Sequence, residues 1–184
     1  MLWNLPNTLT WTRIAAIPLI VLLFYMPYPW GDPAAGVLFA AAGVTDSLDG
    51  YFARRLGQIS RLGAFLDPVA DKLIVAVALV LLVSRDPRAL IVLTAAIIVG
   101  REITISALRE WMAEIGHRRK VAVSRLGKYK TILQIAGLAM MLYRLPLLGL
   151  PTYTFGVVLT EVAAAATLVS MVVYLRAAWP ELKR

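Results

Sequence analysis

The amino-acid sequence predicts an all-α integral membrane protein, a single domain over residues 1–184 that folds as a bundle of six transmembrane helices. Composition is the first reason, because 60% of the 184 residues are hydrophobic and only 16% are charged. A soluble domain is roughly half apolar and a quarter charged. The mean hydropathy of +0.73 therefore indicates a surface that faces lipid. The order of apolar runs and basic residues along the chain supports the same class.

Six apolar runs are long enough to cross a bilayer, which takes about 20 mostly apolar residues. Proline, glycine and charged residues interrupt the chain between runs, at residues 27–33, 85–87 and 146–151, as is typical of connections. By the same length rule, the expected spans run roughly over residues 9–27, 34–55, 62–84, 88–113, 126–143 and 153–176.

Basic residues divide unequally between the two ends of the expected bundle. One end holds three of them, Arg85, Arg88 and Arg144. The other end holds Arg54, Arg55, Arg61, Arg109, Arg118, Arg119, Lys120, Arg125, Lys128, Lys130, Arg176, Lys183 and Arg184. Because membrane proteins keep Lys and Arg on the cytoplasmic side, we expect both termini at the cytoplasm. The net charge of +8 then fits a lipid bilayer with anionic headgroups, and no nucleic-acid partner is expected.

The scarcity of cysteine and histidine limits which metal ions this chain can bind. Cysteine is absent and His117 is the one histidine. Disulfides, thiolate sites and histidine-based zinc sites are therefore excluded. Any bound metal has to be a hard cation held by oxygen atoms.

Four aspartates lie close to the cytoplasmic ends of two consecutive spans. Asp46 and Asp49 end the second span, and Asp67 and Asp71 begin the third. Spacings of three and four residues put each pair on one helix face. A short connection makes the two helices antiparallel neighbours, so we expect the two faces to meet. Ordinary helix-end charges are the alternative, but four carboxylates on matched faces at membrane depth indicate a site for one or two divalent cations.

Small residues share the two helix faces with the aspartates. Gly50 and Ala53 continue the first stripe, and Gly63 precedes the second. Because these residues have little or no side chain, an extended ligand could approach the backbone beside the carboxylates.

Residues 46–71 match the pattern D-x2-D-G-x2-A-R-x8-G-x3-D-x3-D at every fixed position. This segment resembles the signature of the CDP-alcohol phosphatidyltransferase family. Residues 4–10, 101–113 and 121–131 are in addition similar to one branch of the family, in which the acceptor alcohol is glycerol 3-phosphate.

The resemblance implies a homodimer in the bacterial cytoplasmic (inner) membrane, with the active site at the cytoplasmic side. It implies transfer of a phosphatidyl group from CDP-diacylglycerol to an alcohol with release of CMP, and Mg²⁺ or Mn²⁺ as cofactor, as two ions. The implied metal ligands are Asp46, Asp49, Asp67 and Asp71, and Asp71 is also the implied general base. The implied CDP-lipid contacts are Asp49, Gly50, Ala53, Arg54 and Gly63.

Charge balance favours an acceptor that carries a phosphate. Two divalent cations offset four carboxylates, which leaves the pyrophosphate of the CDP-lipid and the acceptor phosphate to be matched by basic side chains. We expect Arg101, Arg109 and Lys128 to bind the acceptor phosphate. The alternatives are a local ion pair of Arg109 with Glu102 or Glu110, and a purely topological role for Lys128.

Other functions and two further charged residues stay open at this level. The same chemistry with inositol phosphate or serine as acceptor is the nearest rival, although serine needs no second phosphate site. A divalent-cation transporter or a prenyltransferase is the more distant alternative. Arg13 is either a substrate contact or an interfacial anchor, and Glu161, deep in the sixth span, is either a dimer contact or a partner of another polar group.

Overall fold

The computed structural model of the chain describes residues 5–56, 61–117 and 125–183. Within these ranges, the side chains of residues 5–7, 9, 46–56, 61, 62, 64, 125–128 and 182 are not described. Every long regular element in the described ranges is an α-helix, and the one extended pairing is an isolated bridge between Leu147 and Leu150. The predicted all-α class is therefore confirmed.

Six helices occupy the described ranges, one for each expected span. They are α1 (Leu5–Tyr25), α2 (Gly31–Leu56), α3 (Arg61–Arg85), α4 (Ala89–Glu114), α5 (Arg125–Tyr143) and α6 (Thr152–Leu182). The largest departure is the end of α6, which lies beyond the expected residue 176. The apolar run stops at Arg176, but Arg176, Ala177 and Ala178 are good helix formers, so the helix continues.

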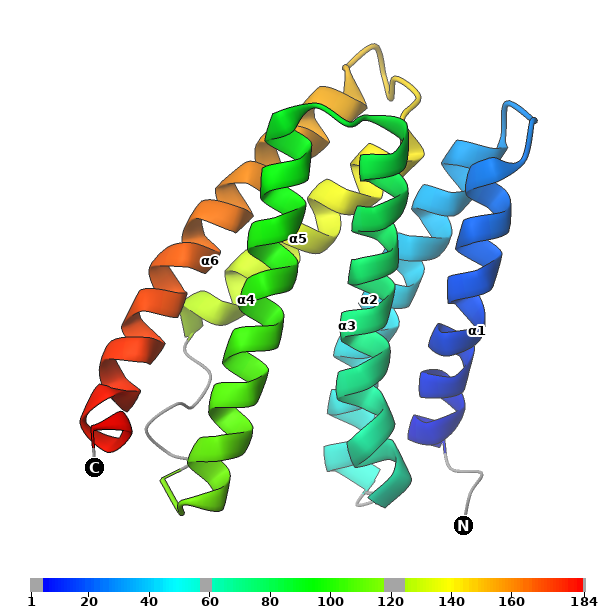
Figure 1. Cartoon of the computed structure of the whole chain (residues 1–184). Helices are drawn as coiled ribbons and strands as arrows, with labels where there is room; N and C mark the ends of the chain where they lie inside the picture. Colours follow the sequence, from blue (N-terminus) through cyan, green and yellow to red (C-terminus); the bar gives the residue numbers. More distant parts are fainter. Residues whose placement is uncertain (1–4, 57–60, 118–124, 184) are drawn as a thin grey trace.

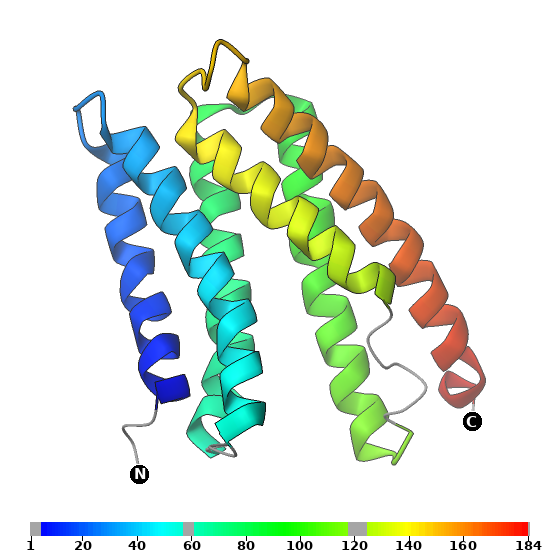
Figure 2. The same cartoon turned by 180° about the vertical axis from the view of Figure 1, so that it is seen from behind.

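The helices alternate in direction along the bundle (Figures 1 and 2). As a result, the start of α1 and the end of α6 lie at the same end, together with the starts of α3 and α5 and the ends of α2 and α4. We call this the aspartate end, because the four aspartates lie in the helices near it. The opposite end carries the connections α1–α2, α3–α4 and α5–α6.

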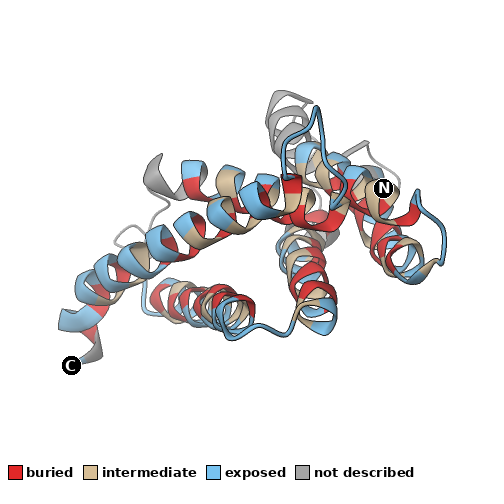
Figure 3. Cartoon of the chain, turned by 90° about the horizontal axis from the view of Figure 1, so that it is seen from above, coloured by how far each residue is buried: buried red, intermediate tan, exposed pale blue. Residues whose placement is uncertain are grey.

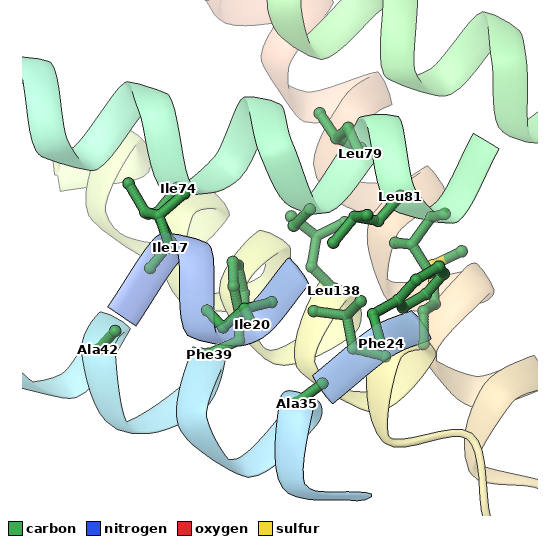
Figure 4. Packing of buried hydrophobic residues seen from close by; sticks show 14 of the residues in the cluster. Ile17, Ile20, Phe24, Ala35, Phe39, Ala42, Ile74, Leu79, Leu81 and Leu138 are labelled. Carbon is green, nitrogen blue, oxygen red and sulfur yellow. The ribbon is translucent and has the colours of Figure 1, made fainter. Parts of the chain in front are cut away.

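The helices pack in two groups, α1–α3 and α4 with α6, and α5 contacts both groups. α1 packs against both α2 and α3, α5 packs against α2 and α6, and α4 packs against α6. Large side chains from three helices, Ile20, Phe39 and Leu138, are at most 1% exposed and meet in the main apolar cluster (Figure 4). α3 and α4 lie closest near their connection and separate toward the aspartate end, where α4 runs beside α6 (Figures 1 and 2).

Glycines permit the closest helix crossings in the bundle. A Cβ built on Gly137 of α5 would lie 2.9 Å from the carbonyl oxygen of Gly156 on α6. A Cβ on Gly36 of α2 would lie 2.6 Å from the backbone of Tyr143 on α5. Lipid tails remove the hydrophobic drive for helices to associate, so close van der Waals packing between small residues carries this role. The seam between α5 and α6 therefore depends on glycine.

Ion pairs neutralise most of the basic residues at the opposite end. Arg85 pairs with Asp32 of α2 and donates to the carbonyl of Phe24. Arg88 donates to both carboxylate oxygens of Asp86, at 2.8 and 2.6 Å. This guanidinium, followed by the hydroxyl of Tyr153, holds the pKa of the Asp86 carboxyl far below its usual range. The opposite end is therefore close to neutral, and most of the net charge of +8 lies toward the aspartate end.

The outer surface of the bundle is apolar. α4 (Ala89–Glu114) and residues Thr152–Glu181 of α6 are each long and apolar enough to cross a membrane, and Thr10–Tyr25 is a shorter apolar helix; these were found by length and composition among the described residues. Figure 3 shows buried residues along the sides where helices face one another and exposed residues on the outward sides. Phe65, Val80 and Val169 are each 67% exposed there. These features indicate a membrane protein.

We predict that Gly137→Ala destabilises the fold by about 1–3 kcal/mol, the usual cost of overpacking a tight interior. The added methyl group would meet the backbone of α6 and the hydroxyl of Thr160. Thermal unfolding in detergent micelles measures the effect. Gly100→Ala is the matched control, because a Cβ at Gly100 has no atom within 4 Å and alanine is the better helix former by up to about 1 kcal/mol. Equal melting temperatures for the two variants would contradict the close crossing.

Candidate functional site

Two carboxylates of α3 lie one helical turn apart and contact α1. The hydroxyl of Thr10 donates to Oδ1 of Asp67, and the guanidinium of Arg13 donates to Oδ1 of Asp71. Thr10 is fully buried and Arg13 is 2% exposed, whereas the side chain of Asp71 is 41% exposed. The two carboxylates are therefore held from α1, and Asp71 is in part exposed.

The other two aspartates of the signature lie in the last turns of α2. The side chains of Asp46 and Asp49, and those of Ala53 and Arg54, lie outside the described residues, as does Gly50. Gly63, in the first turn of α3, is described and is buried. The expected metal and CDP-lipid contacts from α2 therefore stay predictions.

The α3 carboxylates have partners that the sequence did not indicate. α1 packs against both α2 and α3. The expectation that the faces of α2 and α3 meet beside the aspartates stays a prediction, because the side chains of residues 46–56 lie outside the described residues. The described partners of Asp67 and Asp71 belong to α1. The interpretation of Arg13 as an interfacial anchor is wrong, because its side chain is buried against a carboxylate. An arginine at the edge of an apolar run was the only sequence signal.

Basic side chains of α4 and α5 lie within electrostatic range of one another. Arg101 is 8% exposed and Lys130 is 6% exposed, and the charges of Arg101, Glu102 and Arg109 all act on the Lys130 ammonium. Arg101 pairs with Glu102 through Nη1. Among the described residues, the buried Nε atoms of both arginines and Nζ of Lys130 have no hydrogen-bond partner. Buried donors without acceptors are costly, so this cluster is suited to an anionic ligand.

Arg109 is held by α6. Its guanidinium carbon lies 5.3 Å from the ring centroid of Tyr174, and its Nη2 lies 3.5 Å from the Tyr174 hydroxyl. Tyr174 belongs to a second apolar cluster between α4 and α6. The alternative pairing of Arg109 with Glu102 is wrong, because Glu102 pairs with Arg101. No sequence signal connects residues 65 positions apart, so the contribution of α6 was missed.

Lys128, the third expected phosphate ligand, has a side chain outside the described residues. Lys130, two residues further along α5, is the lysine whose described ammonium is buried beside Arg101 and Arg109. Sequence position alone could not rank the two lysines, because both obey the positive-inside rule.

Glu161 of α6 finds its partner inside the bundle. The hydroxyl of Thr94 on α4 is hydrogen-bonded to Oε1 of Glu161. Thr94 is 4% exposed, so the contact ties α4 to α6 in an apolar region. Of the two expectations for Glu161, pairing with another polar group is confirmed.

The donor set of the α3 carboxylates suits a hard divalent cation. Asp67 and Asp71 supply oxygen atoms only, and neighbouring carboxylates on one helix face favour a bridging cation. Among the residues that were searched with described side chains, no group of three or more His, Cys, Asp or Glu could hold a metal. The four-aspartate metal site, which includes Asp46 and Asp49, therefore stays a prediction.

Comparison with known proteins gives a consistent result along the whole chain. A family model described as CDP-alcohol phosphatidyltransferase matches residues 3–175. The CDP-diacylglycerol–glycerol-3-phosphate 3-phosphatidyltransferase of Pseudomonas fluorescens is 50% identical over 185 residues, which cover 98% of this chain and 92% of the relative. The proteins of the same name from Escherichia coli K12 and Shigella flexneri are 50% and 49% identical over 182 residues, covering 99% of this chain and 98% of each relative.

We predict that Lys130→Met raises the melting temperature in phosphate-free buffer by about 2–4 °C, the shift that corresponds to roughly 1 kcal/mol in a chain of this size. The reason is that the substitution removes a buried ammonium without a partner. Added inorganic phosphate should stabilise the wild type more than the variant, because the anion then binds a site with one cation fewer. Lys183→Met is the control, since Lys183 is exposed. Equal stabilisation of all three proteins by phosphate would contradict an anion site at Lys130.

Proposed function

Because the chain belongs to the CDP-alcohol phosphatidyltransferase family, we propose that it transfers a phosphatidyl group from CDP-diacylglycerol to glycerol 3-phosphate, giving phosphatidylglycerophosphate and CMP. The observation that carries this proposal is the 50% identity, over nearly the full length, to relatives that bear the name of this reaction. The basic cluster of the buried Arg101 and Lys130 and the partly buried Arg109 supports an acceptor that brings its own phosphate.

The proposed setting is the bacterial cytoplasmic membrane, with all six helices crossing it and the aspartate end at the cytoplasm. Two described helices meet the length and hydropathy needed for a span, and the outward surface is apolar. The ion pairs at the opposite end leave the aspartate end as the more basic one, as the positive-inside rule requires of a cytoplasmic face. Both substrates are then reached from the bilayer surface. A homodimer is part of the proposal, on the resemblance to the family.

Divalent metal ions are the general cofactor of this family, and the carboxylates fit them. We assign Asp46, Asp49, Asp67 and Asp71 as the ligands of two Mg²⁺ or Mn²⁺ ions. When bound, such ions supply Lewis-acid neutralisation of the pyrophosphate charge that grows as CMP leaves. Asp67 and Asp71 contribute from α3 in orientations that α1 fixes.

The CDP part of the lipid is assigned to the face where α2 ends and α3 begins. Asp49, Gly50, Ala53, Arg54 and Gly63 are the proposed contacts. Arg54 would supply a guanidinium for a phosphate oxygen, which is the geometry that arginine serves best.

The acceptor phosphate is assigned to Arg101, Arg109 and Lys128, and we add Lys130. A phosphate monoester carries close to two negative charges and three acceptor oxygens, which matches a cluster rich in unused donors. Serine carries no phosphate to fill this cluster. An inositol phosphate would fill it as well, so it is the rival that an experiment has to separate.

Asp71 is the proposed general base. Oδ1 is held by Arg13, so Oδ2 is the atom we assign to the proton of the acceptor hydroxyl. The hydroxyl oxygen then attacks phosphorus in line with the departing CMP, without a covalent enzyme intermediate. A cation transporter would have no use for the base or for the phosphate cluster.

We predict CMP release from CDP-diacylglycerol with glycerol 3-phosphate as acceptor, and little with serine, when purified protein is assayed in mixed micelles with Mg²⁺ or Mn²⁺. Inositol phosphate is the third arm. CMP release with serine alone, or with inositol phosphate alone, would overturn the assignment of the acceptor. Metal uptake into proteoliposomes without lipid substrate would support the transporter.

We predict that Asp71→Asn lowers turnover by about 10²–10⁴-fold, the usual contribution of a general base, while Mn²⁺ binding stays measurable through the remaining carboxylates. Asp86→Asn is the matched control, because Asp86 lies in the connection at the opposite end and should leave turnover unchanged. Near-normal turnover of Asp71→Asn would remove Asp71 from the base role.

A further inference from the structure

We propose that Thr10 and Arg13 of α1 are positioning residues that hold the carboxylates of Asp67 and Asp71 for divalent-cation binding and proton transfer. The proposal rests on the function given above, in which these two aspartates ligate the metal ions. It makes α1 part of the catalytic centre, although the family signature lies entirely on α2 and α3.

The two helices meet in matched register. Thr10 and Arg13 are three residues apart and share one face of α1, and Asp67 and Asp71 are four residues apart on one face of α3. Thr10 contacts Asp67 and Arg13 contacts Asp71. Further along, Ile17 and Ile74 belong to the same buried cluster (Figure 4). The apolar packing of α1 on α3 thus sets the height at which the polar pairs form.

Burial makes the two contacts specific. Thr10 is fully buried and Arg13 is 2% exposed. An arginine taken out of water in an apolar bundle is tolerated only with an anionic partner, and the Nη1 contact of Arg13 holds Oδ1 of Asp71 toward α1. An exposed arginine side chain can adopt many conformations toward a partner. The buried side chain of Arg13 has few, so it holds the carboxylate of Asp71 in one place.

Each contact engages one oxygen of its carboxylate, and in both cases this is Oδ1. The other oxygen, Oδ2, is the atom that we assign to a metal or to the acceptor proton. Groups that hydrogen-bond to metal ligands orient them, and their loss commonly costs about 10–100-fold in metal affinity or activity. The two residues should differ in their effect on metal affinity. Thr10 is neutral, whereas Arg13 brings a positive charge that opposes cation binding.

Binding of Mn²⁺ to the full-length protein in micelles, followed by electron paramagnetic resonance without lipid substrate, tests the role of Thr10. Thr10→Val should weaken Mn²⁺ binding by about 10–100-fold, because it keeps the shape and removes the donor, and Thr10→Ser should restore it. Thr104→Val is the matched control; its hydroxyl donates to the carbonyl of Gly100 on the same helix. Wild-type Mn²⁺ affinity in Thr10→Val would overturn the role of Thr10.

Arg13→Gln should give the opposite pattern. Mn²⁺ should bind at least as tightly as to the wild type, because a cation has been removed, while kcat falls by about 10–100-fold since Asp71 is no longer oriented. Arg13→Lys should recover kcat only in part, because an ammonium lacks the planar fork. A generally damaged fold would weaken Mn²⁺ binding in both variants. Wild-type kcat in Arg13→Gln would overturn the role of Arg13.

Asp67→Asn separates failure of this proposal from failure of the proposed function. If Asp67→Asn weakens Mn²⁺ binding and Thr10→Val does not, Asp67 is a ligand that Thr10 does not position. If Asp67→Asn itself binds Mn²⁺ as the wild type does, the metal assignment of the proposed function is wrong, and the positioning role falls with it.

Discussion

A charge buried in an apolar helix bundle has to be matched by an opposite charge, a hydrogen-bond partner or a ligand, and this requirement organises the molecule. The ion pair between Arg13 and Asp71 is the clearest instance, because the arginine is almost completely buried while the carboxylate is partly open. The arginine meets an opposite charge in Asp71, and the carboxylate is held toward α1 by Arg13. The pair thus joins the stability of the α1–α3 contact to the geometry of the site.

The same requirement distinguishes the two charged regions at the aspartate end. The α3 carboxylates have protein partners on α1, whereas the cluster of Arg101, Arg109 and Lys130 keeps buried nitrogen atoms without acceptors among the described residues. Satisfied polar groups stabilise a fold, and unsatisfied ones are tolerated where a ligand supplies what is missing. A phosphate that arrives with the acceptor would bring the missing oxygen atoms.

Helix packing explains how residues far apart in the chain serve one region. The glycine seam of α5 and α6 brings these helices close together, and α4 runs beside α6 toward the aspartate end (Figure 1). Tyr174 can therefore hold Arg109, and Thr94 can pair with Glu161. At the opposite end, Asp32 and Asp86 neutralise Arg85 and Arg88, which leaves the excess positive charge of the chain toward the aspartate end.

The sequence by itself determined the all-helical class, the six helices and the aspartate pattern. The reason is that the length of an apolar run and spacings of three and four residues are local properties that can be read from the sequence. Asp67 and Asp71 could be assigned to one face of one helix for this reason. Only the tertiary structure decided that α1 supplies their partners, that Lys130 lies buried beside Arg101, and that Tyr174 holds Arg109. Those contacts depend on which helices pack together and at what height. Which helices pair in a bundle depends on the combined fit of many small and apolar side chains. No short sequence pattern specifies that combined fit.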